Sequence, residues 1–225
     1  MSVLIQNMSM RRGKKRVIQQ LDLLVETGEV AALIAPNGYG KTTLLNGIAQ
    51  LLPAAYDRLS LCGISPISYK DYRHSLFFLE STAQLSDYLS AFDYLTLIKH
   101  YWKSKMDCQT VFQRLKMTEY TTLPIGKMSL GMKQHVLLAA YLISDTPVML
   151  FDEPLNGLDP GSIAIFDHLI SQWRAEGKTI LLSTHAIANV QSICSRAFFL
   201  KNGKIIVESS DMKEILPTYH RLYEV

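Results

Sequence analysis

An apolar segment, a glycine-containing loop and an amphipathic helix follow one another near the start of this 225-residue sequence, and this succession constrains the fold most strongly. Residues 30–35 are apolar throughout, as expected of a buried central strand. The loop at 36–43 nearly fits the phosphate-binding pattern G-x-x-x-x-G-K-[ST], with Ala35 in place of the first glycine. Such a loop directs backbone N–H groups and a helix N-terminus at phosphates. The sequence therefore predicts a nucleotide-binding α/β fold.

Every residue of this loop is a candidate nucleotide ligand. Lys41 would reach the β and γ phosphates, and Thr42 would bind Mg²⁺. An ordinary turn between a strand and a helix is the alternative, which the Gly-Lys-Thr-Thr sequence at the start of a helix disfavours. The candidate phosphate-binding residues are Asn37, Gly38, Tyr39, Gly40, Lys41, Thr42 and Thr43.

The rest of the chain alternates β-type and helical patterns, which predicts a mostly parallel sheet covered by helices, with antiparallel β elements near both termini. Residues 148–151 and 179–182 read as strands joined by a crossover helix, and the helix after the loop ends near Pro53. Residues 197–200 and 204–207 flank an Asn-Gly turn, a hairpin expected to close the chain. Helical spacing in 85–125 predicts an inserted helical subdomain that divides the nucleotide-binding core into 1–84 and 126–225.

Composition argues against several classes of protein, namely zinc-binding, disulfide-rich, secreted and membrane-spanning chains. Hydrophobic residues make up 48% and charged residues 19%, which is typical of a globular domain, and 23 basic minus 20 acidic residues give a net charge of +3. The 3 cysteines are far apart, so neither a zinc site nor a disulfide framework is indicated. The longest apolar runs fall short of the roughly 20 residues that cross a bilayer, and the N-terminus lacks the pattern of a secretory signal. We therefore expect an intracellular chain without a membrane span.

Two adjacent carboxylates, Asp152 and Glu153, follow the strand at 148–151. Ligands of open α/β sheets bind at this carboxyl edge. Asp152 is a candidate for holding Mg²⁺ through water, and Glu153 for polarising an attacking water. A solvated strand end is the alternative for an isolated pair, but the phosphate loop favours the catalytic interpretation.

Three further segments complete a recognisable order of motifs. Residues 128–134, Met-Ser-Leu-Gly-Met-Lys-Gln, resemble the signature motif of ATP-binding cassette (ABC) ATPases. Residues 155–160 are similar to the D-loop of that family, and 183–185 to its switch-histidine segment. The resemblance covers essentially the whole chain and implies a P-loop NTPase core that hydrolyses ATP with Mg²⁺.

The resemblance also implies roles for residues outside the phosphate loop. Two cassettes would pair head to tail, with Ser129 and Gly131 of one facing the ATP held by the other. Ser129 suits the N-cap of a helix from 131 to 143. His185 would contact the γ-phosphate and hold the attacking water against Glu153; a core histidine is the alternative.

The sequence departs from the family pattern at three places. Arg12 stands where an aromatic residue often stacks on adenine, so Arg12 and Val17 are the candidate nucleoside contacts. Comparable affinities for ATP and GTP would support a weaker fit to adenine at this place. Glu80 replaces the usual Q-loop glutamine and is a third candidate Mg²⁺ ligand with Thr42 and Asp152. Leu130 and Met132 replace the usual glycine and glutamine of the signature.

The basic run at 11–16 raises nucleic acid or acidic lipid as a partner, but a glycine at its centre favours a solvated turn, and no nucleic acid is expected. The resemblance favours the motor subunit of an exporter of peptides or drug-like molecules, including antimicrobial-peptide export and self-immunity. The alternative is a soluble ABC-type ATPase that acts on nucleic acid, ribosomes or a protein assembly.

The expected partners are a multi-span membrane permease and a second cassette. A homodimer would contain two complete sites, although family members also pair unequally. The insert would supply part of the permease interface, with aromatic residues Phe92, Tyr94, Tyr101 and Trp102 as candidates. The chain would then lie at the cytoplasmic face of the cell membrane.

Overall fold

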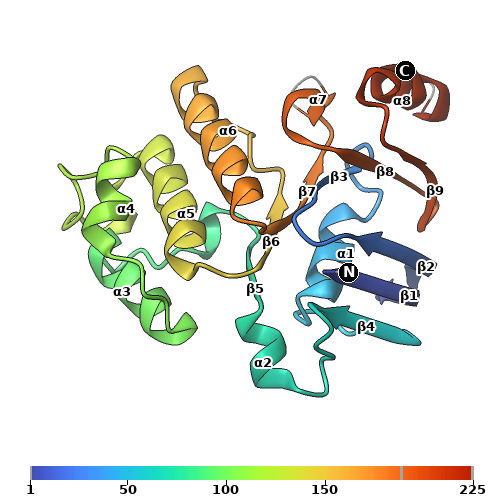
Figure 1. The fold of residues 1–225 in the computed structure, drawn as a ribbon, viewed down its shortest axis with the longest axis horizontal. Helices are drawn as coiled ribbons and strands as arrows, with labels where there is room; N and C mark the ends of the chain where they lie inside the picture. The colour runs from blue at the N-terminus through green and yellow to red at the C-terminus, as the bar shows by residue number, and fades with distance from the viewer. Residues whose placement is uncertain (1, 188–189, 224–225) are drawn as a thin grey trace.

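The computed structural model describes residues 2–187 and 190–223 and contains two β-sheets with helices packed on them (Figure 1). The larger sheet is formed by β3 (Val30–Ile34), β5 (Leu76–Leu79), β6 (Val148–Asp152), β7 (Thr179–Thr184), β8 (Arg196–Lys201) and β9 (Lys204–Ser209). Its order is β5-β6-β7-β3-β8-β9, and neighbouring strands are parallel except for the antiparallel pair β8–β9. The predicted mostly parallel α/β sheet is confirmed.

A smaller antiparallel sheet comes from the N-terminal part of the chain. It contains β1 (Val3–Arg12), β2 (Lys15–Val25) and β4 (Arg58–Leu61) in the order β2-β1-β4. Buried and more exposed residues alternate along β1, as in a strand with one face on the core. β1 and β2 form a hairpin that turns at Gly13, whose φ of +60° favours glycine.

Helix α1 (Lys41–Ile48) lies between the two sheets (Figure 1). Leu44 and Leu45 are fully buried and share one apolar cluster with Ile5 of the antiparallel sheet and Leu150 of the parallel sheet. The helix ends at Ile48, earlier than the sequence indicated, and the chain then turns through Gln50 at φ +55°. Burial from both sides fixes the helix directly after the phosphate loop.

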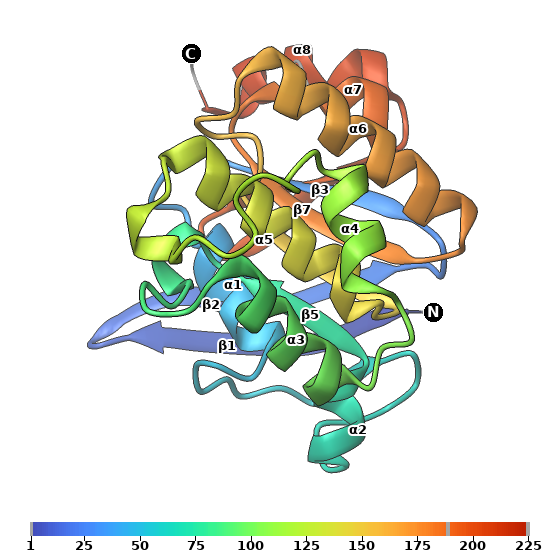
Figure 2. The ribbon, with the colours of Figure 1, turned by 90° about the vertical axis from the view of Figure 1, so that its left-hand side faces the viewer.

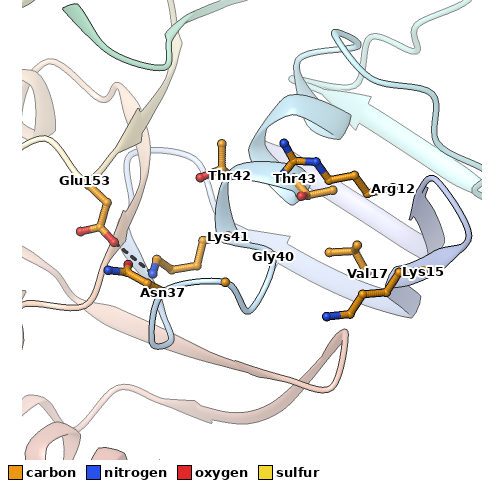
Figure 3. A pocket seen from close by; sticks show the side chains of 10 residues that line it. Arg12, Lys15, Val17, Asn37, Gly40, Lys41, Thr42, Thr43 and Glu153 are labelled. Atoms are coloured by element: carbon orange, nitrogen blue, oxygen red, sulfur yellow. Dashed lines mark ion pairs between the residues drawn. The ribbon is translucent and has the colours of Figure 1, made fainter.

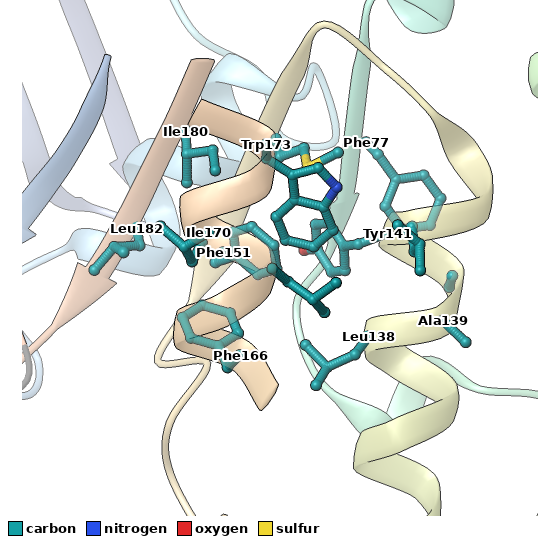
Figure 4. Packing of buried hydrophobic residues seen from close by; sticks show 14 of the residues in the cluster. Phe77, Leu138, Ala139, Tyr141, Phe151, Phe166, Ile170, Trp173, Ile180 and Leu182 are labelled. Atoms are coloured by element: carbon teal, nitrogen blue, oxygen red, sulfur yellow. The ribbon is translucent and has the colours of Figure 1, made fainter. Parts of the chain in front are cut away.

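The other face of the parallel sheet is covered by α5 (Leu130–Ser144) and α6 (Pro160–Ala175) (Figure 4). Phe151 stacks on Tyr141 of α5 with a centroid distance of 3.9 Å and packs edge-on against Phe166 of α6 at 5.4 Å. The Tyr141 hydroxyl donates to the Leu150 carbonyl, and burial raises the pKa of this phenol. These contacts hold the end of β6, and so Asp152, in place.

The segment 85–125 contains α3 (Ala91–Trp102) and α4 (Cys108–Arg114), and α2 (Tyr69–His74) precedes it (Figure 2). α3 begins at a capping box between Ser90 and Asp93. Trp102 donates from Nε1 to the Leu76 carbonyl over 3.1 Å and packs on Phe77. The helical character predicted for this segment is confirmed. The apolar core of α3 and α4 is continuous with that of α5 and the sheet, so the separate subdomain stays a prediction.

The C-terminal part contains α7 (Val190–Ile193) and α8 (Ile215–Tyr223). The predicted hairpin is present as β8 and β9, but the expectation that it closes the chain is wrong, because α8 follows and buries Ile215 and Thr218. Short 3₁₀ turns occur at Thr82–Gln84, Ile125–Lys127 and Met212–Glu214. No helix within 2–187 and 190–223 has both the length and the hydrophobicity needed to cross a bilayer.

Candidate functional site

The phosphate loop joins β3 to α1 and has a backbone that requires its glycines. Gly38 has φ +83° and Gly40 φ +105°, both positive. A Cβ atom on Gly40 would lie 2.7 Å from Cγ1 of Val17. Asn37 and Gly38 are exposed at the tip of the loop. The N–H groups of the first turn of α1 have no intrahelical partners, so the loop and helix together form an anion-binding site.

Lys41 folds back into this loop. Its Nζ donates to the carbonyl oxygens of Ala35 at 2.7 Å and Pro36 at 3.3 Å, and it pairs with Oε1 of Glu153 at 3.0 Å (Figure 3). The side chain is 5% exposed. The backbone carbonyl at position 35 accepts from the lysine, a contact that does not depend on the alanine side chain, and the lysine joins the loop to the acidic end of β6.

Asp152 is held by hydroxyl groups from two neighbouring segments. Thr42 Oγ1 donates to Asp152 Oδ2 over 2.6 Å, and Ser183 Oγ donates to Asp152 Oδ1. The parallel register of β6 and β7 pairs Asp152 with Ser183. Burial raises the pKa of Asp152, the two hydroxyls oppose this shift, and the nearby charges of Glu153 and Glu80 reinforce it. A cation beside Asp152 would relieve this repulsion.

The candidate magnesium ligands Thr42, Asp152 and Glu80 gather at the start of α1. Thr42 bonds to Asp152, and Asn46 Nδ2 donates both to the Thr42 carbonyl at 2.9 Å and to Glu80 Oε2 at 3.1 Å. Among the described residues, no three His, Cys, Asp or Glu side chains converge as a complete metal site. This incomplete oxygen donor set fits Mg²⁺, which is commonly held by one or two carboxylates, substrate phosphates and water.

Glu153, which follows Asp152 at the end of β6, contacts His185. Glu153 has a left-handed backbone, with φ +48°, and its Oε2 lies 2.9 Å from Nδ1 of His185. When Glu153 is ionised, Nδ1 of His185 donates this hydrogen bond, and in a neutral imidazole Nε2 is then an acceptor. Because Lys41 pairs with the other oxygen, Glu153 is oriented from both sides.

A cavity of about 350 Å³ connects the phosphate loop and Glu153 with the end of the β1–β2 hairpin (Figure 3). His185, Asp152 and Glu80 do not line it. Its phosphate-loop end contains Lys41, Thr42 and Glu153, and its opposite end is formed by side chains of the hairpin, among them Arg12 and Val17. The contact of these two residues with a nucleoside stays a prediction. The lining residues are Arg12, Lys15, Val17, Asn37, Gly38, Gly40, Lys41, Thr42, Thr43 and Glu153.

The signature residues lie outside this cavity. Ser129 is the N-cap of α5, as predicted, and its Oγ accepts from the Met132 N–H over 3.3 Å. Ser129 and Gly131 are exposed, and Leu130 is 58% exposed. The chain therefore does not bring its own signature to its own phosphate loop.

Sequence reasoning missed several residues of the site. Asn46 links Glu80 to Thr42 but lies outside the motifs, and Ser183, which belongs to the switch-histidine segment, binds Asp152 although no role was given to it. Tyr39 packs edge-on against Tyr223 of α8 with a centroid distance of 5.4 Å. The position of Asn46, one helical turn after Thr42, was a usable signal, whereas the contact with α8 had none.

The comparisons agree with this geometry. A family model described as ABC transporter matches residues 18–156. The chain is 33% identical over 208 residues to the ABC transporter ATP-binding protein NatA of Bacillus subtilis, covering 87% of this chain and 83% of NatA. It is 30% identical over 205 residues to the lantibiotic transport ATP-binding protein SrtF of Streptococcus pyogenes, covering 91% of this chain and 89% of SrtF.

A solved structure described as the ATP-binding subunit of an ABC transporter has the same fold, with a TM-score of 0.88 and 23% identity over 100% of this chain and 94% of that one. The phosphate loop, the acidic end of β6 and the signature helix thus occur together in a chain whose family match covers more than half its length. The chain belongs to the ABC transporter family, as an ATP-binding cassette of the kind that hydrolyses ATP.

Proposed function

We propose that this cassette is the ATP-hydrolysing motor of an exporter whose substrate is a peptide or a drug-like molecule, working with a separate membrane subunit. The observation that carries the proposal is the single cavity in which Lys41, Thr42 and Glu153 meet. A phosphate-binding loop, a metal-binding carboxylate and an oriented carboxylate base are the parts that phosphoryl transfer to water requires.

Residues 37–43 would bind the triphosphate through backbone N–H groups, with Lys41 at the β and γ phosphates. Mg²⁺, held by Thr42, Asp152 and Glu80, would neutralise charge on the phosphate oxygens. Lys41 is paired with Glu153 at 3.0 Å in the protein alone, and on binding it would exchange this contact for phosphate oxygens. Glu153 would then be free to accept a proton.

Glu153 is the proposed general base for the attacking water. The Nδ1 of His185, 2.9 Å from Glu153, would keep the carboxylate in one orientation, and its other ring nitrogen would reach the γ-phosphate or the water. Both residues would therefore act in the transition state more than in binding.

A second cassette would complete the site. Ser129 and Gly131 are exposed at the start of α5 and lie outside the cavity of their own chain. The N-terminus of α5 is suited to a phosphate supplied by another chain. We propose a homodimer, because one sequence provides the phosphate loop, Glu153, His185 and the signature residues.

ATP-binding subunits of ABC transporters work with membrane permeases, and the SrtF relative is named for lantibiotic transport. Export of a peptide across the cell membrane, with this chain at the cytoplasmic face, follows as the finer proposal. Exposed apolar side chains near α3, at Tyr88, Phe92, Leu97 and Tyr101, support a permease interface there, whereas Trp102 packs inward.

The catalytic proposal is tested with Glu153→Gln, which keeps the shape of the side chain and removes the base. We expect hydrolysis at saturating Mg-ATP to fall roughly 10²- to 10⁴-fold while the affinity for ATP changes less than about threefold. Phosphate release and calorimetric binding measure the two quantities. Glu176→Gln, outside the site, is the control. Wild-type turnover in Glu153→Gln would reject the role of Glu153.

The transport proposal is tested by tagging the chain in its native cell and identifying what co-purifies after gentle solubilisation. A protein with several membrane spans is the expected partner, and replacing Tyr88 and Tyr101 with serine should weaken its recovery without lowering ATP hydrolysis by the free cassette. Ile206→Ser, an exposed apolar site on β9, is the matched control. Recovery with ribosomes or nucleic acid instead would establish the soluble alternative.

A further inference from the structure

The end of the nucleotide cavity opposite Glu153 is lined by two cations. Arg12 ends β1 and Lys15 begins β2, and Figure 3 places their side chains on either side of Val17 at the hairpin end of the cavity. Lys14, the intervening basic residue of the turn, does not line the cavity. The hairpin therefore presents two of its basic residues to the nucleotide site.

Neither cation is neutralised by the protein. Within the described part of the chain, no carboxylate lies within ion-pair distance of Arg12 or Lys15, and both side chains are exposed. Arginine and lysine can donate hydrogen bonds but cannot accept them. A ligand group that lies between them must therefore supply acceptors.

The arrangement of the cavity indicates which part of a bound nucleotide would lie between Arg12 and Lys15. With the terminal phosphate beside Lys41 and Glu153, the nucleoside extends toward Val17, whose Cγ1 lies 2.7 Å from the position of a Cβ on Gly40. Val17 thus provides an apolar surface close to the loop for the nucleoside, and Arg12 and Lys15 flank it. In this placement the base would lie within reach of the two donors.

We propose that Arg12 and Lys15 recognise the base and make the cassette prefer purines with an oxygen at position 6, so that GTP and ITP bind more tightly than ATP. Guanine presents O6 and N7 as acceptors, the pair that arginine and lysine bind best, whereas adenine presents an amino donor at position 6. A donor facing a donor leaves adenine unpaired at that position. This inference deepens the proposed function and rests on the assignment of the cavity to a nucleoside triphosphate.

A different use of the same charges would be contact with the phosphates or the ribose. Those groups are common to all the nucleotides, so such contacts would strengthen binding without discrimination between bases. The two cases therefore predict different effects of removing the cations. Contacts with the base would lower the affinity for some nucleotides only, whereas contacts with phosphate or ribose would lower it equally for all.

The test measures dissociation constants of Mg-ATP, Mg-GTP and Mg-ITP for the full chain by calorimetry. We expect GTP and ITP to bind roughly 3- to 10-fold more tightly than ATP. The double variant Arg12→Ala/Lys15→Ala should lose this margin, with the affinity for ATP changed less than about twofold. Lys14→Ala, the matched loss of charge in the same turn, should leave the order of affinities unchanged.

Tighter binding of ATP than of both GTP and ITP by the wild-type chain would overturn the inference while leaving the proposed function intact. An equal loss for the three nucleotides in the double variant would also overturn it and assign the cations to phosphate or ribose. Binding of none of the three would overturn the proposed function as well.

Discussion

The N-termini of α1 and α5, which the proposed function assigns to the same ligand, differ in how the chain presents them. At α1, Gly40 caps the helix in a positive-φ conformation, the loop packs on Val17, and Lys41 is 5% exposed. At α5, Ser129 caps the helix with its side chain, and Ser129 and Gly131 are exposed. One phosphate-binding terminus is assembled by the fold, and the other is left on the surface.

This difference indicates where the ATP site is incomplete. Packing fixes the position of the first terminus, because the loop, β6 and the hairpin restrain one another. The exposed terminus has an N-cap and a small residue, which suit close approach of a phosphate, and in the proposed dimer that phosphate would come from the other cassette. Substitution of one glycine in each region separates these roles.

Gly40→Ala should have the largest effect. Its Cβ would lie 2.7 Å from Val17, and alanine tolerates φ +105° poorly, a strain of about 1–3 kcal/mol that displaces the loop N–H groups. We expect the affinity for the triphosphate to fall roughly 10- to 100-fold, measured by calorimetry on the free chain. Gly38→Ala is the control, since its φ is positive but no atom lies within 4 Å of the new Cβ. Its loss of affinity for the triphosphate should therefore be smaller. Equal effects would exclude packing on Val17 as the cause.

Gly131→Ala should leave binding by the free chain unchanged. No atom lies within 4 Å of a Cβ at this helical position, so the melting temperature should stay the same or rise. In the assembled transporter, where the signature would face the ATP of the other cassette, we expect hydrolysis at saturating ATP to fall about tenfold. Phosphate release by the purified complex measures this, and full activity would contradict the pairing proposed for α5.

Sequence reasoning reached the parts of the site that are local in the chain. A loop pattern of eight residues identified the region around Lys41, and the apolar strand before Asp152 placed the acidic pair, because each motif is read over a few adjacent residues. The Ser129 cap was likewise found from its position before an apolar helical stripe. These elements specify chemistry without knowledge of their neighbours.

The missed contacts join segments that lie far apart in the sequence. Asn46 meets Glu80, Ser183 meets Asp152, and Tyr39 meets Tyr223, and no periodic pattern relates the members of these pairs. Helix α8 was not predicted because Pro217 and its short length weaken its helical signal. Such contacts depend on strand register and on packing, which the topology of the whole sheet decides.

Asp152→Asn tests how much the buried negative charge of Asp152 destabilises the folded chain. Burial, with the charges of Glu153 and Glu80, raises the pKa of Asp152 in the folded chain, so ionised Asp152 destabilises the free protein at neutral pH. Below the raised pKa the folded state binds the extra proton, and this penalty is lost. We therefore expect Asp152→Asn to melt roughly 4 °C higher than wild type near about pH 7.5, with a difference that shrinks as the pH falls through the raised pKa toward the ordinary pKa of an aspartate.

These melting curves are recorded without Mg²⁺ or nucleotide. With Mg-ATP present the order should reverse, because wild type gains stability from the ligand and the variant loses a metal ligand. A lower melting temperature for Asp152→Asn at neutral pH would mean that the hydrogen bonds from Thr42 and Ser183 outweigh the cost of burying the charge.

Tyr223→Phe should have the smallest effect. It tests whether α8 stabilises the position of the phosphate loop. The Tyr223 hydroxyl donates to the carbonyls of Leu200 at 2.9 Å and Ile34 at 3.2 Å, and the ring packs on Tyr39. Phenylalanine keeps the ring contact and removes both hydrogen bonds, so we expect a loss of about 1 kcal/mol, or about 2 °C in melting temperature, with triphosphate affinity within about twofold of wild type. Tyr69→Phe, at an exposed ring, is the control. An affinity loss much larger than the loss of stability would mean that the assembled half of the site depends on the last helix as well as on its glycines.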